Sequence, residues 1–97
     1  MGSAIKRLVL DVLKPHTPIL AEMATELSKV PGVEGVNLSI LEIDKDTENV
    51  KITLEGHDIN YEEVLKKIKH MGGTVHSTDE VAAGKRLVEE VKTHQDK

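Results

Sequence analysis

The chain has 97 residues, of which 38% are hydrophobic and 31% charged, and this balance predicts a single soluble domain with one core. It contains no cysteine, which excludes disulfides, thiolate zinc sites, iron–sulfur clusters and thiol catalysis. A net charge of -4 and a single aromatic residue, Tyr61, argue against nucleic-acid binding. No apolar run is long enough to cross a bilayer and no signal peptide is visible, so we expect a cytoplasmic protein without membrane contact.

The first half of the chain predicts a strand, a helix and a second strand. Residues 5–14 alternate, which places Leu8, Leu10 and Val12 on one face. Thr17 is predicted to cap a helix that begins at Pro18 and ends before residues 31–32. The apolar stripe of this helix is Ile19, Leu20, Met23, Ala24 and Leu27. The second strand, residues 34–44, has Val36, Leu38 and Ile40 facing inward and Asn37, Ser39, Leu41 and Ile43 facing outward.

The second half predicts a hairpin, a helix and a last strand. After a turn at residues 45–47, a third strand has Val50, Ile52 and Leu54 facing inward. Asn60 with Glu63 matches a capping box, and Ile59 with Val64 a hydrophobic staple, so a helix starts there. A fourth strand runs over residues 74–81 with His76, Thr78 and Glu80 on the outer face. Residues 86–91 fit a short helix or an extra strand, and residues 92–97 a frayed tail.

The resulting order of elements, β-α-β-β-α-β, matches the split βαβ motif. Right-handed crossovers then give a four-stranded antiparallel sheet of order 4-1-3-2 with both helices on one face. We therefore predict an α+β domain of the ferredoxin-like class over residues 5–91, with one sheet face left open.

Three stretches are familiar as a set: RLVLDVLKPH at residues 7–16, EGVN at residues 34–37 and HSTDEVAAGK at residues 76–85. Together they resemble the archaeal conserved-region family catalogued as domain of unknown function 211, over residues 5–89. The resemblance implies a ferredoxin-like fold and ring-shaped homo-oligomers. It implies no established activity and no catalytic residue.

The hairpin at residues 44–48 carries three carboxylates at alternate positions, those of Asp44, Asp46 and Glu48. Oxygen ligands at that spacing can converge on a hard cation such as calcium or magnesium. The hairpin lacks the loop glycine and the distant bidentate glutamate of a calcium loop. An ordinary polar turn, which favours Asp, is the alternative interpretation.

The predicted topology gathers basic groups at the same end of the sheet. Asp11, Lys14, His16 and His76 are the residues we expect to line a small-ligand site there, or a composite active site between subunits. His16, His70 and His76 could bind a transition metal, but their spacing matches no known motif. Capping and surface histidines are the simpler explanation. Residues 82–86, AAGKR, could form a backbone anion nest with two cations, although a glycine turn after a strand explains them too.

The open sheet face is predicted to carry an apolar patch of Val9, Leu13, Leu41 and Ile43. A contiguous exposed patch usually marks a contact, and scattered surface aliphatics are the alternative. The central strands lack the stacking aromatic residues of RNA-recognition domains. Three functions remain: a homo-oligomeric ligand- or ion-binding regulatory module, a protein binding divalent metal at its acidic hairpin, and an enzyme with a site shared between subunits.

Overall fold

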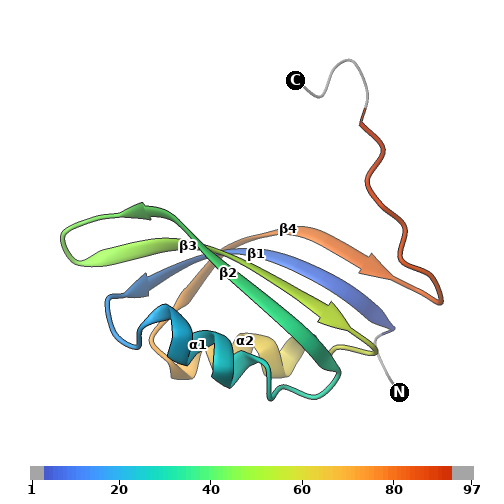
Figure 1. Cartoon of the computed structure of the whole chain (residues 1–97), viewed down its shortest axis with the longest axis horizontal. Coiled ribbons are helices and arrows are strands. Elements are labelled where there is room, and N and C mark those ends of the chain that lie inside the picture. The colour runs from blue at the N-terminus through green and yellow to red at the C-terminus, as the bar shows by residue number, and fades with distance from the viewer. Residues whose placement is uncertain (1–3, 93–97) are drawn as a thin grey trace.

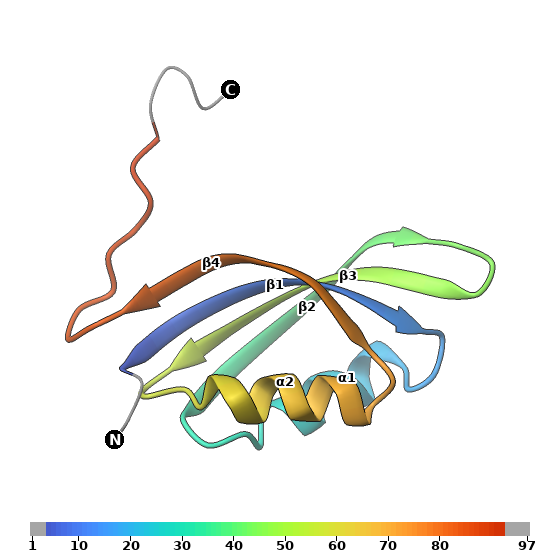
Figure 2. The ribbon, with the colours of Figure 1, turned by 180° about the vertical axis from the view of Figure 1, so that it is seen from behind.

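The computed structural model describes residues 4–92 as one sheet covered by two helices on one face (Figure 1). The elements are β1 (Ile5–Pro15), α1 (Leu20–Leu27), β2 (Val33–Ile43), β3 (Thr47–Gly56), α2 (Tyr61–His70) and β4 (Thr74–Ala83). All neighbouring strands are antiparallel, in the order β2-β3-β1-β4. The predicted α+β class, strand order and one-sided helix layer are therefore confirmed (Figure 2).

The core lies between the sheet and the helices, where the predicted alternation holds in the central strands. Leu8, Leu10 and Val12 of β1 are fully buried. Their fully buried neighbours are Val50, Ile52 and Leu54 from β3, Met23 and Leu27 from α1, and Val64 and Ile68 from α2. The inward residues of β2 are only partly buried, because β2 is an edge strand and no strand lies beyond it.

The helix starts were predicted with unequal success. Helix α2 starts as expected, since the Asn60 side chain accepts a hydrogen bond of 3.1 Å from the Glu63 backbone N–H. The return bond of a capping box is absent, because the Asn60 N–H donates to the Pro31 carbonyl at 3.1 Å. The predicted Thr17 cap is wrong: Ile19 is the N-cap, its backbone is extended, and no side chain caps α1.

Extra residues in the edge strands change which side chains face outward. In β4 the pairing with β1 skips His76 and Asp79. Thr78 therefore lies opposite Leu10 on the helix face, where its hydroxyl is 2.9 Å from the Tyr61 hydroxyl. The prediction that Thr78 faces outward is wrong because each extra residue reverses the alternation after it.

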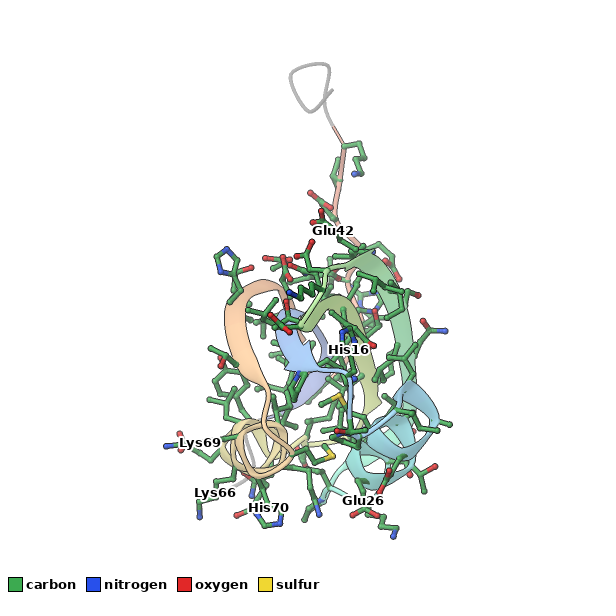
Figure 3. The ribbon with its side chains drawn as sticks, turned by 90° about the vertical axis from the view of Figure 1, so that its left-hand side faces the viewer. His16, Glu26, Glu42, Lys66, Lys69 and His70 are labelled. Carbon is green, nitrogen blue, oxygen red and sulfur yellow. The ribbon has the colours of Figure 1, made fainter. Side chains whose placement is uncertain are left out.

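The pairing of β2 with β3 is shifted in the same way at two places, at Glu34 and at Leu41. The second shift skips Leu41, so Glu42 lies on the open face (Figure 3). Ile43 pairs with Glu48, which lies opposite Lys14 in the inward row of β1. The predicted placement of Ile43 on the open face is therefore wrong.

Beyond β4 the chain has neither helix nor strand over residues 84–92, so both alternatives predicted for residues 86–91 are wrong. This segment rises from the sheet on the side opposite the helices (Figures 1 and 2). Of the predicted tail, residues 92–97, all but Lys92 lie outside the described residues. Within residues 4–92, neither helix has the length and apolar character needed to cross a bilayer.

Candidate functional site

A buried lysine lies at the end of the sheet where β1 meets the β2–β3 hairpin. Lys14 continues the inward row of β1, and its side chain has no exposed surface. Its Nζ donates to Glu48 Oε1 at 2.9 Å and to the Pro15 carbonyl at 2.7 Å. The β1–β3 register causes this contact, because it places Lys14 directly opposite Glu48. An ammonium buried in this way requires such partners, since burying an unpaired charge costs several kcal/mol.

His16 completes the cluster from the loop after β1. Its Nδ1 is 2.8 Å from Glu48 Oε2, and its Nε2 is 2.9 Å from the Lys45 carbonyl oxygen. Because both partners are acceptors, the protonated ring can donate from both nitrogens. The pKa of His16 is raised, mainly by its hydrogen bond with Glu48 and next by its hydrogen bond with the Lys45 carbonyl. The pKa of Glu48 is lowered, mainly by its hydrogen bond with His16 and next by its hydrogen bond with Lys14.

The cluster brings together two of the four predicted ligand residues. Lys14 and His16 meet through Glu48, whereas Asp11 lies on the opposite face of β1 and accepts a hydrogen bond from Asn49. His76 is an extra residue of β4 and is exposed. In the described part of the chain, no buried side-chain polar atom lacks a partner. The cluster therefore ties the hairpin to the end of β1 and has its own hydrogen-bonding groups satisfied.

The predicted cation ligands are not brought together. Glu48 is engaged by Lys14 and His16, while Asp44 and Asp46 are exposed in the turn. Among residues 4–92 no three His, Cys, Asp or Glu side chains are grouped to hold a metal ion. His70 lies on the outer surface of α2, away from His16 (Figure 3). Calcium or magnesium at the hairpin stays a prediction, and a cation would compete with two basic groups for Glu48.

A second charged cluster lies on the open face, around Arg7 of β1. The Arg7 guanidinium binds Glu55 at 2.8 Å and Glu80 at 3.3 Å. It also makes a bidentate contact with Glu89, in which Nη1 donates to Oε1 at 2.8 Å and Nη2 donates to Oε2 at 3.1 Å. The pKa of Arg7 is raised, mainly by its hydrogen bonds with Glu89 and next by that with Glu55. The same contact with Arg7 lowers the pKa of Glu89. The sequence places Arg7 on this face, but no local signal indicates that Glu89 returns to it.

The predicted apolar patch is reduced by the edge-strand geometry. Val9 is 8% exposed, whereas Leu13 is 41% and Leu41 57% exposed. Ile43 is also exposed, but it lies on the other face. A contact through these four residues as one surface therefore loses its geometric basis, and a role for Leu13 and Leu41 stays a prediction.

Comparison with known proteins identifies the family. A family model described as an uncharacterized ArCR, domain of unknown function 211 (DUF211), matches residues 6–97. An uncharacterized protein of Methanocaldococcus jannaschii is 50% identical over 95 residues, which cover 98% of each chain. The predicted resemblance is confirmed: this chain belongs to the DUF211 family.

Proposed function

We propose that this protein is a homo-oligomeric module whose copies are joined by exchange of residues 85–92, here called the C-terminal arm. The observation that carries the proposal is that the arm's apolar side chains are exposed to solvent. Leu87, Val88 and Val91 are 37%, 65% and 80% exposed. Exposed apolar side chains that lie close together mark protein–protein contacts more often than single scattered ones do.

The arm leaves its own domain for a local reason. Gly84 has a φ of +113°, which turns the chain away from β4, and its N–H donates to the Ala4 carbonyl at 2.8 Å. Beyond this point residues 85–92 form no strand. Burying a Val or Leu side chain fully contributes about 1.5–3 kcal/mol, so covering the arm would stabilise an assembly.

Arg7 is the residue we propose as the receptor for a neighbour's arm. Its contact with Glu89 is bidentate, and bidentate arginine–carboxylate pairs are stronger and more directional than single neutral hydrogen bonds. In the single chain this contact holds the arm above the open face. A neighbour's Glu89 can make the same contact with the same atoms, which is how exchange of an element preserves its interactions.

A catalytic alternative has less support. The predicted ligand residues do not converge within residues 4–92, since Asp11 and Lys14 point to opposite faces of β1. No specific observation favours an active site shared between subunits, so the proposal is limited to assembly through the arm.

Light scattering on the full chain at micromolar concentration tests the assembly. We expect a mass above the 10.7 kDa of one chain. The double substitution Val88→Glu with Val91→Glu should lower that mass, because it places charges where apolar contact is proposed. Ile19→Glu is the matched control, since Ile19 is 60% exposed at the start of α1. A 10.7 kDa species at every concentration would contradict the proposal.

A charge-swap experiment tests whether the arm is exchanged or stays on its own chain. Arg7→Glu and Glu89→Arg should each weaken assembly, because each places like charges together. In a mixture of the two variants, exchange brings the substituted receptor of one chain against the substituted arm of the other, which restores an opposite-charge pair. The unchanged Arg7 and the unchanged Glu89 meet in the reverse direction. We therefore expect the mixture to regain the larger mass, and a mixture no larger than either variant alone would mean that the contact forms within one chain.

A further inference from the structure

Two shallow pockets on the surface are lined by basic side chains, and they differ in how those charges are neutralised. The first lies on α2 and is lined by Glu63, Lys66, Lys67 and His70. There Lys66 Nζ lies 3.7 Å from Glu63 and Lys67 Nζ 3.5 Å from Glu26. Lys66 and His70 point outward from the helix layer (Figure 3). Both lysines of this pocket therefore have an acidic partner within the molecule.

The second pocket, here called the corner pocket, lies where β1 begins and β3 and β4 end. Its lining residues are Ala4, Lys6, His57, Asp58, Gly84 and Lys85. In Figure 1 this corner is beside the N-terminal end of β1 and the base of the arm. The segments that form it are held together by hydrogen bonds from Gly84 N–H to the Ala4 carbonyl at 2.8 Å and from Ile59 N–H to the Ile5 carbonyl at 3.0 Å.

The basic groups of the corner pocket have no acidic partner in the described part of the chain. Lys6 Nζ lies 3.1 Å from His57 Nδ1, so one basic group is hydrogen-bonded to another. Neither Lys6, His57 nor Lys85 forms an ion pair within residues 4–92, although Asp58 also lines the pocket. This local excess of positive charge occurs in a chain whose net charge is -4.

We infer that the corner pocket binds a small anion, with the phosphate group as its chemical class. An ammonium has no acceptor, so in the Lys6–His57 contact Nδ1 is the acceptor. The ring proton of the neutral imidazole is then on Nε2, which adds a donor to the two ammonium groups. Three donors from three separate segments suit the tetrahedral oxygens of phosphate better than the planar oxygens of a carboxylate. The two positive charges of Lys6 and Lys85 also exceed the one negative charge of Asp58, and a phosphate supplies the missing negative charge.

The pocket is built from one chain, so this inference does not depend on exchange of the arm. The probe is inorganic phosphate, added to the full chain at constant ionic strength while backbone amide signals are followed by nuclear magnetic resonance. We expect saturable shifts centred on His57 and Gly84. The affinity should fall by roughly twofold to fivefold in Lys6→Gln and in Lys85→Gln, because each removes one exposed charge contact.

Lys66→Gln is the matched control, since it removes an exposed lysine that lines the pocket on α2 and already has Glu63 as an acidic partner. Its affinity for phosphate should equal that of the unchanged chain. Shifts that do not saturate, or that weaken equally in all three variants, would show only non-specific attraction of the anion and would overturn the inference.

Discussion

Lys14 is the only charged residue with a fully buried side chain in residues 4–92, and its environment predicts an asymmetry between two substitutions. Glu48→Gln leaves the buried ammonium with neutral partners only, whereas Lys14→Met removes the charge and keeps an unbranched side chain. Removing one partner of a buried ion pair is costly, while replacing the charge by an apolar group is often neutral. We expect Glu48→Gln to lower the urea midpoint clearly more than Lys14→Met. The opposite order would show that Glu48 is not the counter-charge of Lys14.

The contact between His16 and Glu48 makes a pH-dependent contribution to stability. Because the folded pKa of His16 is raised, its contribution is complete below the ordinary value of 6.5 and is lost as the pH rises through the folded value. Because the folded pKa of Glu48 is lowered, its contribution is present above 4.5 and is lost as the pH falls through the folded value. The stabilising effect is therefore largest between these two ordinary values.

This dependence can be measured by urea unfolding from about pH 4 to about pH 8. The difference in unfolding free energy between the unchanged chain and His16→Gln should be largest near pH 6 or slightly below and should shrink towards pH 8. A difference that stays constant across the range would contradict the assigned contact.

At the scale of elements, the two helix starts give a matched pair of substitutions. Asn60→Ala removes the side chain that caps the start of α2 and should cost about 0.5–2 kcal/mol of unfolding free energy. Thr17→Ala changes an exposed residue that caps no helix and should stay within about 0.5 kcal/mol. Denaturant unfolding measures both. A larger effect at Thr17 than at Asn60 would support the prediction from sequence that Thr17 is the N-cap of α1.

The alternation of apolar residues predicted the inward rows of β1 and β3, and the order of elements combined with right-handed crossovers predicted the strand order. The alternation failed at His76, Asp79 and Leu41, where an edge strand takes up an extra residue. No glycine or proline marks these positions, because the register is set by pairing with the neighbouring strand.

The candidate site was recovered only in part for a similar reason. Lys14 and His16 meet at the hairpin through Glu48, which was predicted only as one of three carboxylates along the chain. Its partner is the residue opposite it in β1. The arm was predicted to be a helix or a strand because its apolar spacing fits both, yet it has no regular structure, and its apolar side chains Leu87, Val88 and Val91 stay exposed.

At the scale of the whole molecule, stability depends on one core between the sheet and the helices. Leu10 is fully buried in that core, at the centre of the strand that pairs with both β3 and β4. Leu10→Ala should therefore cost about 2–5 kcal/mol of unfolding free energy. Val88→Ala, at a residue 65% exposed, should stay within about 0.5 kcal/mol under dilute conditions in which the chains are separate. A small effect at Leu10 would contradict the assigned inner face of β1.

Exchange of the arm has a thermodynamic consequence for the whole molecule. If copies bind one another only when folded, mass action stabilises the folded state more strongly as protein concentration rises. The melting temperature of the full chain should then increase over about a hundredfold range of concentration. In the double variant Val88→Glu with Val91→Glu it should not change with concentration, and it should match the unchanged chain at high dilution. That agreement at high dilution separates lost assembly from a damaged domain, since both substituted side chains are exposed in the single chain. An unchanged chain whose melting temperature is the same at every concentration would show that the arm contributes no contact between folded copies.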